Sequence, residues 1–507
     1  MNLVSVVDRW SKEVPSKPAL ISPEKEEALT YAAFKKATEH FAVALREMGI
    51  GPGERVFCLL PNSPEFVISF YGTMRAGAIF VPVNPAYQEH DLGAILLDCT
   101  PKLIITTPEK LAVLQGFLPR LPQSRVVLVA EEAQEHLSFS TLLANREGFS
   151  FPPLQDEEVA ELIYTSGTTG EPKGAMLTHD GLARNAFNFS QTMKFSSRDV
   201  SLLMAPAFHI AAQTCLLNVS LVSGATVVCS GWNLHRFFEA FSRYKITYFF
   251  GPPTFYIQIL ENYNPQEHDL STWRAAFSGA APVPEEVFHR FQKTFGFPII
   301  EGYGLSETSP VVAHNPIDGP QKPQSIGRAF PEVEIRIVDR NDQDLPPGEV
   351  GELITRSPYL MKGYWNRPKE TAEAIKGGWF HTGDLAYVDH EGYYYIVDRK
   401  KDMINKGGCK VYPREVEEVL FKHPAVIDVI VVGVPDLLRG EEVKAYIVPR
   451  PGKEVSVREL KKYCRANLAP YKVPRYIEFV SSLPKTVTGK PLRRLLREGE
   501  KEKAPVG

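Results

Sequence analysis

The sequence lacks the patterns that a disulfide framework or a structural zinc site requires. Its six cysteines are far apart and no two have CxxC spacing: Cys58, Cys99, Cys215, Cys229, Cys409 and Cys464. Dispersed cysteines are typical of a reducing compartment, so we expect a cytoplasmic protein. Charged residues between Asp8 and Glu13 lie where a signal peptide would need an apolar run.

The sequence also lacks a dominant charge, internal repeats and low-complexity segments. Lys and Arg number 57 against 60 Asp and Glu, a formal net charge of −3. This balance gives no electrostatic reason to expect nucleic acid or an anionic membrane as the main partner. The 507 residues, 44% of them hydrophobic, suffice for at least two domains with a large core.

Residues 200–235 contain no Lys, Arg, Asp or Glu, a stretch long enough to cross a bilayer. Pro206, Gln213 and Gly224 interrupt it, and residues 225–228 are rich in β-branched side chains. The pattern therefore favours a buried helix followed by a buried strand over a membrane span. We expect no transmembrane segment, while peripheral membrane contact and a homodimer both stay open.

Short apolar strands alternate with helices in the first third of the chain. The expected strands are 55–60, 78–82, 102–106 and 125–129, with helices at 64–76 and 91–98. This alternation predicts βαβ units and largely parallel sheets. Beyond residue 319, turn-separated segments predict antiparallel strands.

The fold class is therefore α/β with α+β sub-regions. We expect a large N-terminal domain of βαβ-type sheets with a small β-barrel-like region, followed by a small mobile α+β domain. A charged cluster at 398–402 marks the boundary, which gives an N-terminal domain at 1–398, a hinge at 399–402 and a C-terminal domain at 403–507.

The most informative segment runs from Leu162 to Gly174, where an apolar strand enters a loop of Gly, Ser and Thr with one lysine. Its loop residues are Thr165, Ser166, Gly167, Thr168, Thr169, Gly170 and Lys173. Glycines let backbone N–H groups approach a polyphosphate, hydroxyls add donors, and the lysine adds charge. The loop is not a GxxxxGK[ST] P-loop, because Gly174 follows Lys173.

These residues resemble the phosphate loop of the adenylate-forming superfamily, and four further motifs follow in that family's order. The resemblance covers about residues 20–495. The motifs are 302–308 (Gly-Tyr-Gly-Leu-Ser-Glu-Thr), 382–384 (Thr-Gly-Asp), 398–402 (Asp-Arg-Lys-Lys-Asp) and 484–490 (Pro-Lys-Thr-Val-Thr-Gly-Lys). The motif sequences are most similar to those of bacterial medium- and long-chain fatty-acid–CoA ligases. The resemblance implies ATP, Mg²⁺ and coenzyme A as cofactors.

The resemblance also implies roles for single residues. Lys490, Glu307 and His209 would act in catalysis, with Lys490 bridging the acid and the α-phosphate. Thr165 and Glu307 would hold the metal. The remaining nucleotide, acyl and CoA contacts would come from Gly279, Ala280, Ala281, Gly302, Tyr303, Gly304, Ser306, Asp384, Arg399, Lys401, Gly407 and Gly408. Lys401 would also be the hinge about which the small domain rotates.

Within this family the acid stays open. The charge-free segment after His209 favours an apolar acid, because it supplies little to bind a second charge or a hydroxyl on the substrate. An aromatic acid, or an acyl-adenylate ligase with an acceptor other than CoA, remains the alternative. A luciferase-like oxygenase shares the same motifs, whereas a carrier-protein adenylation domain would need an acidic residue for an amino group, which residues 200–235 lack.

Overall fold

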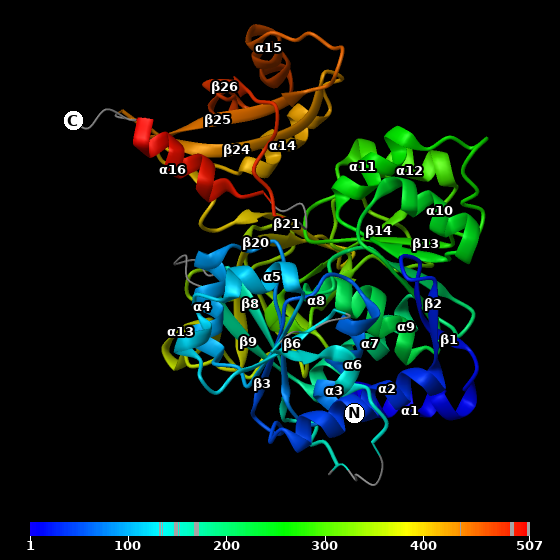
Figure 1. Cartoon of the computed structure of the whole chain (residues 1–507). Helices are drawn as coiled ribbons and strands as arrows, with labels where there is room; N and C mark the ends of the chain where they lie inside the picture. The colour runs from blue at the N-terminus through cyan, green and yellow to red at the C-terminus, as the bar shows by residue number, and fades with distance from the viewer. Residues whose placement is uncertain are drawn as a thin grey trace.

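The structure is a computed structural model. It describes residues 1–507 apart from 131–132, 134, 147–150, 152, 167–171, 437, 487–490, 504–507 and the side chains of 166 and 501–503. Two large sheets form most of the N-terminal part, and a separate lobe at the top of Figure 1 contains the C-terminal elements.

The first large sheet has seven strands, all parallel to their neighbours except the last. In spatial order they are β7 (Leu137–Ser138), β6 (Arg125–Leu128), β5 (Leu103–Thr106), β3 (Arg55–Cys58), β4 (Ile79–Pro82), β8 (Val159–Ser166) and the antiparallel β9 (Pro172–Thr178). Helices α4 (Glu89–Cys99) and α5 (Pro108–Leu114) pack on its outer face. The expected βαβ units in the first third are therefore confirmed.

The second large sheet has nine strands, with a parallel centre and antiparallel edges. They are β16 (Arg328–Ala329), β15 (Val311–His314), β14 (Ile299–Gly304), β13 (Ala275–Ser278), β12 (Tyr248–Phe250), β10 (Val200–Leu203), β11 (Thr226–Cys229), β1 (Pro18–Ser22) and β2 (Glu27–Thr30). Helices α10 (Leu234–Tyr244), α11 (Pro253–Asn262) and α12 (Glu285–Phe295) cover its outer face, the green helices of Figure 1.

The largest core cluster lies between these two sheets, because it joins apolar residues of both with those of the helices between them. These helices are α1 (Leu3–Glu13), α2 (Tyr31–Glu47), α3 (Pro64–Arg75), α6 (Phe139–Leu142), α7 (His179–Thr192), α8 (Ile210–Ala212), the π-helix η2 (Gln213–Asn218) and α9 (Val219–Val222). Local signals set their ends: in α3 the Ser63 side chain accepts from the Phe66 N–H at 3.2 Å, and Gly77 follows with φ +77°.

The charge-free segment forms α8, η2 and α9 and then β11, and all residues of these four elements are buried except Ala211. The expectation of a buried helix followed by a buried strand is confirmed. Among the described helices, none is long and apolar enough to cross a membrane. All six cysteines are unpaired, as expected, and only Cys409 is exposed.

Two smaller sheets follow. The third contains β17 (Glu334–Val338), β18 (Gly351–Arg356), β20 (Trp379–Val388), β19 (Ile375–Lys376) and β21 (Tyr394–Arg399), all antiparallel, with helix α13 (Pro368–Ala374). The fourth contains β23 (Cys409–Val411), β22 (Ile404–Lys406), β25 (Gly440–Pro449), β24 (Val426–Asp436) and β26 (Tyr476–Phe479). Helices α14 (Pro413–Phe421) and α15 (Val457–Asn467) pack on one face of it, and α16 (Arg493–Lys503) lies on the other.

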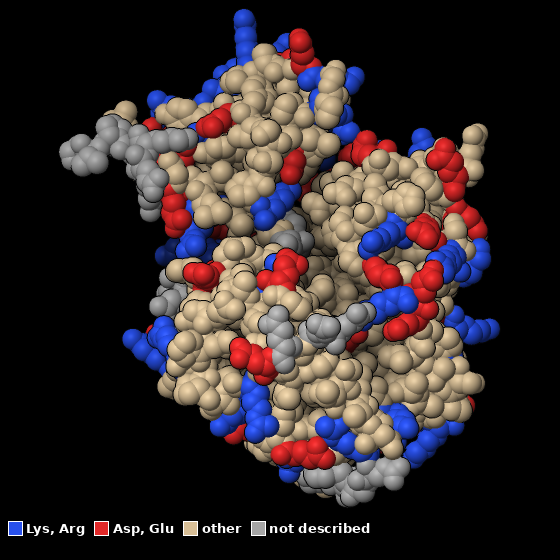
Figure 2. All heavy atoms as spheres, viewed as in Figure 1, with Lys and Arg blue, Asp and Glu red and all other residues tan. Residues whose placement is uncertain are grey.

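The fourth sheet uses only residues after 403, which agrees with the expected small α+β unit. The boundaries at 398 and 402 remain a prediction. Lys, Arg, Asp and Glu are interspersed over the face shown in Figure 2, so no large field of one sign covers it.

Candidate active site

The phosphate loop begins and ends in one antiparallel hairpin. Thr165 on β8 pairs with Lys173 on β9, so these residues flank the loop at its base. Several loop residues predicted to bind phosphate lie outside the described residues: Gly167, Thr168, Thr169, Gly170 and the side chain of Ser166. The Lys173 ammonium lies 5.6 Å from the centroid of the Tyr364 ring, within cation–π range.

Tyr364 connects this hairpin to the second motif. Its hydroxyl donates a hydrogen bond of 2.8 Å to Glu307 Oε1, and Glu307 lies in the short 3₁₀ helix η3 (Ser306–Thr308). Burial, and then the charge of Glu307, raise the pKa of Tyr364 well above its usual value, so it stays a donor. Sequence reasoning missed Tyr364 as a site residue, because its partner lies 57 positions away.

Asp384 connects the motif at 382–384 with the motif at 302–308. The Tyr303 hydroxyl donates to Asp384 Oδ2 at 2.5 Å, and Arg399 Nε lies 3.2 Å from Asp384 Oδ1. A carboxylate has about four lone-pair sites, so Asp384 keeps acceptor capacity for sugar hydroxyls. Burial, followed by the Asp384 charge, raises the pKa of Tyr303. Three of the expected residues are thus brought into direct contact.

The small residues of the site lie where backbones approach closely. A Cβ on Gly304 would lie 2.2 Å from the Pro310 carbonyl oxygen, and one on Gly302 would lie 2.4 Å from Phe277 Cζ. Gly279 faces the Gly302 carbonyl oxygen, and Ala280 has φ +67°. Residues 279–281 directly follow β13, which is parallel to β14. Carboxyl ends of parallel strands are the usual ligand-binding edge of such sheets.

His209 lies at the same edge, after β10. Its Nδ1 accepts from the Ala211 N–H at 3.3 Å at the start of α8, so a neutral ring carries its proton on Nε2. Asn62 holds the preceding loop: its amide donates to the carbonyls of Leu203 and Ala205 and accepts from the Ala207 N–H. Asn62 is a second residue that sequence reasoning missed, since it follows β3 of the other sheet.

The hinge and CoA candidates lie in a different environment. Burial, and then the Arg399 charge, lower the pKa of Lys401, whose carbonyl accepts from Arg497 of α16 at 3.1 Å. Gly407 and Gly408, with φ of 59° and 90°, form the turn between β22 and β23. The Gly407 N–H donates to the Arg439 carbonyl at 2.8 Å and the Gly408 N–H donates to Asn405, both within the small lobe, so these contacts do not bring the turn to the nucleotide candidates.

Asn405 and Cys409 lie beside this glycine turn, and the structure explains only the first of them. The Asn405 side chain accepts from the Gly408 N–H at 3.0 Å and so supports the glycine turn. Cys409 is exposed, and nothing in the structure assigns it a role. Lys490 lies outside the described residues.

Glu307 fits a magnesium ligand. Its carboxylate is only 8% exposed, and one oxygen is oriented by Tyr364. Within the described part of the chain, no group of three or more His, Cys, Asp or Glu could hold a metal by itself. Mg²⁺ is commonly held by one or two protein ligands together with substrate phosphates and water, which matches a site of Glu307 and Thr165.

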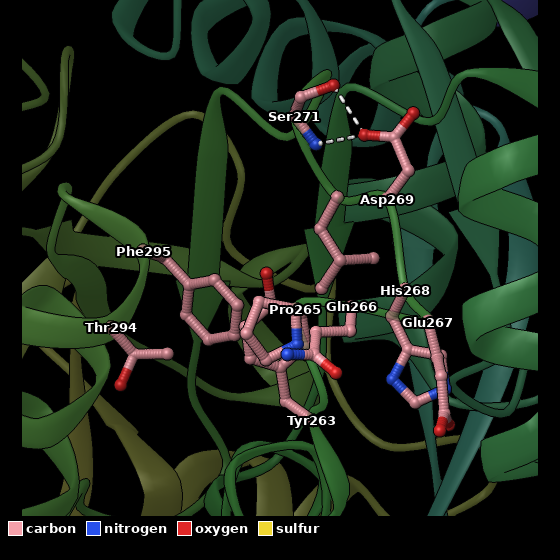
Figure 3. Close-up of a pocket in the computed structure, with 10 residues that line it drawn as sticks. Tyr263, Pro265, Gln266, Glu267, His268, Asp269, Ser271, Thr294 and Phe295 are labelled. Atoms are coloured by element: carbon pink, nitrogen blue, oxygen red, sulfur yellow. Dashed lines mark hydrogen bonds between the residues drawn. The ribbon is translucent and has the colours of Figure 1, made fainter.

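A surface hollow of about 400 Å³ lies elsewhere, between the loop that follows α11 and the C-terminal end of α12, and none of the candidate residues lines it (Figure 3). Two of its polar residues hydrogen-bond to each other, since Ser271 donates from its N–H and its hydroxyl to Asp269. His268 stacks on Phe238 with ring centroids 3.8 Å apart. The hollow is therefore not part of the site.

Comparison with known proteins agrees with this geometry. Residues 7–365 match the AMP-binding enzyme family, and residues 415–490 match the AMP-binding enzyme C-terminal domain. The chain belongs to this family of AMP-binding enzymes.

Two curated relatives and one solved structure illustrate its neighbours. The chain is 38% identical to a long-chain-fatty-acid–CoA ligase of Bacillus subtilis, over 99% of this chain and 95% of the relative. It is 37% identical to a feruloyl-CoA synthase of Amycolatopsis sp, over 93% and 94%. The anthranilate CoA ligase AuaEII in complex with anthranoyl-AMP superposes with a TM-score of 0.94 at 30% identity, over 100% of this chain and 98% of that one.

Proposed function

We propose that this protein is an ATP-dependent acid–CoA ligase that activates a medium- or long-chain fatty acid through an acyl-AMP intermediate. The observation that carries the proposal is the convergence of the motifs. Glu307 is linked through Tyr364 to the phosphate-loop hairpin, and Asp384 is linked to Tyr303 and Arg399. These two groups supply a place for phosphates and a place for a nucleoside.

In the first half-reaction the carboxylate of the acid attacks the α-phosphorus of ATP, and pyrophosphate leaves. Both reactants are anions, so the site must offset negative charge around the phosphorus. Lys173 and Lys490 supply positive charge, and Ser306 supplies a hydroxyl. Mg²⁺ held by Glu307 and Thr165 would neutralise phosphate charge when bound. Asp384 and Tyr303 hold the nucleoside in register for in-line attack.

In the second half-reaction the CoA thiolate attacks the acyl carbonyl, a thioester forms, and AMP leaves. We place the required rotation of the small domain at 399–402, because a few backbone dihedrals at a junction can absorb such a change. The rotation would bring the Gly407–Gly408 turn toward the bound pantetheine. His209, at the carboxyl edge of β10, would line the acyl entrance.

The fatty acid is supported by the relatives and by the buried, charge-free wall formed by α8, η2 and α9. The alternative, an aromatic acid, is favoured by the feruloyl-CoA synthase relative and the anthranilate CoA ligase structure. The cytoplasmic location expected from the sequence stays a prediction.

The test is a competition assay with the purified full chain, ATP, Mg²⁺ and CoA. An equimolar pool of butanoate, octanoate, hexadecanoate and benzoate is supplied, and acyl-CoA and acyl-AMP are identified by mass spectrometry. We expect octanoyl- or hexadecanoyl-CoA together with AMP. Benzoyl-CoA alone would select the aromatic alternative, and acyl-AMP without thioester would select an acceptor other than CoA. The absence of both acyl-CoA and acyl-AMP would refute the proposal.

A further inference from the structure

Two fully buried polar side chains lie close to each other without a hydrogen bond in good geometry. Glu161 lies on β8, and Gln213 is the first residue of the π-helix η2. Both are 0% exposed, and among the described residues neither Glu161 carboxyl oxygen nor either Gln213 amide atom has a partner. Buried polar groups are nearly always paired, so four orphan atoms at one place require a cause.

The two side chains face each other. Burial raises the pKa of Glu161 to about 8, and the nearby Gln213 amide opposes that rise although it is not in hydrogen-bonding geometry. At neutral pH the carboxyl is therefore mostly protonated. A carboxylic acid and a primary amide each offer a donor and an acceptor, which suits a neutral hydroxyl and disfavours a second anionic group.

Their position is continuous with the acyl entrance. The Gln213 N–H donates to the His209 carbonyl at 3.2 Å, so Gln213 lies one helical turn beyond His209. The β8–β9 register is unbroken from Glu161 to Thr165, so these two residues share a face of β8 and lie about 13 Å apart. Ile163 of the same face packs in the core cluster that contains Ile210.

The π-helix extends this polar line. Hydrogen bonds in a π-helix join residues five apart, so Asn218 lies slightly more than one turn after Gln213 and near the same side. The Tyr71 hydroxyl donates to Asn218 Oδ1 at 2.9 Å, while Asn218 Nδ2 has no partner within the described chain. π-helices occur frequently at functional sites, and here the irregular turn holds amide groups inside an apolar core.

We propose that Glu161 and Gln213 form a specificity-determining polar floor of the acyl site, which takes a neutral hydroxyl carried by an otherwise apolar acid. The hydroxyl could belong to a hydroxy fatty acid or to a phenolic acid. The inference rests on the proposed function and narrows its substrate class. It revises the sequence argument that the segment after His209 has little to offer a hydroxyl.

The test compares matched acids with the full-length protein, ATP, Mg²⁺ and CoA. The pairs are decanoate with ω-hydroxydecanoate, and cinnamate with para-hydroxycinnamate. For at least one pair we expect kcat/KM to favour the hydroxylated acid about tenfold or more, because an apolar acid leaves the buried groups unpaired. The pair that shows the preference identifies the source of the hydroxyl.

Variants then assign the preference to the floor. Gln213→Met and Glu161→Met should bring the ratio of the two kcat/KM values close to one, whereas Glu161→Gln keeps a donor and an acceptor and should retain the preference. Thr106→Val is the matched control, since it removes another orphan buried oxygen, on β5, and should leave the ratio unchanged.

The outcomes separate the two proposals. Equal kcat/KM within both pairs for the unmodified protein, or a preference that survives both methionine variants, would overturn the polar floor while leaving the ligase intact. If none of the tested acids were converted to acyl-CoA, the proposed ligase activity would be overturned and the polar floor with it. If a methionine variant fails to fold, the ratio of the two kcat/KM values for the unmodified protein still tests the polar floor.

Discussion

At the scale of single residues, the site depends on contacts that bridge motifs far apart in the sequence. Glu307, Tyr303 and Asp384 could be chosen as candidates from the sequence because each lies in a recognisable motif. Tyr364 and Asn62 could not, since their roles arise only when separate strands and loops fold together. The proximity of Glu161 to Gln213 could not be predicted for the same reason.

Tyr364→Phe tests the bridge between the phosphate hairpin and Glu307. Loss of a hydrogen bond to a charged group costs about 1.5–3 kcal/mol, so we expect kcat/KM for MgATP to fall roughly tenfold to a hundredfold. The assay is acid-dependent pyrophosphate release at varied Mg²⁺. Tyr31→Phe is the control, because that buried hydroxyl bonds the Ala225 carbonyl far from the site. An equal loss in both variants would contradict the bridging role.

At the scale of elements, helices with apolar periodicity and clear ends could be predicted. The expected helix at 64–76 corresponds to α3, and the one at 91–98 corresponds to α4. In contrast, none of the elements expected from the sequence corresponds to α16. Its anchor is a buried charge, since Arg493 donates to both oxygens of Glu417 at 2.7 Å, and such an anchor leaves no hydrophobic pattern in the sequence.

Arg493→Gln tests that anchor. The change leaves the buried Glu417 carboxylate without its partner, and breaking a buried ion pair costs about 3–5 kcal/mol. We expect a lower Tm and slower adenylation, because Arg493 lies three residues after Lys490. Arg494→Gln is the matched control, whose side chain is 65% exposed in a 3.7 Å pair with Glu498. Similar changes of Tm and adenylation rate in the two variants would refute the role of Arg493 as an anchor.

Strand β8 should also carry a pH-dependent stability. Because the pKa of Glu161 is raised to about 8 from 4.5, the folded state binds an extra proton between these values. The contribution of this bound proton to the stability of the folded state is fully present below pH 4.5 and is lost as the pH rises through about 8. Tm of the unmodified protein should therefore fall more from pH 5.5 to 8.5 than Tm of Glu161→Gln, measured by differential scanning fluorimetry. Parallel curves would contradict this assignment.

At the scale of the whole molecule, the small lobe meets the large part through polar contacts with partly exposed side chains. Lys422 lies 2.7 Å from Glu285, Arg450 lies 3.3 Å from Glu261, and the Gln324 amide donates to Glu418. Surface ion pairs of this kind contribute little each, so they can be exchanged at low cost. This favours the rotation between half-reactions that the sequence resemblance predicts, although the hinge itself remains a prediction.

Paired variants separate the two orientations. Proline fixes φ near −65°, so Lys401→Pro should hinder rotation and slow thioester formation far more than adenylation. Lys401→Ala is its control, because it removes the charge but keeps backbone freedom. Lys490→Ala should do the reverse: adenylation falls by several orders of magnitude while CoA thioester formation from pre-made acyl-AMP is spared. Pyrophosphate release measures the first step, and acyl-CoA from added acyl-AMP measures the second. If each variant slowed both steps equally, one fixed orientation would serve both reactions and the alternation would be wrong.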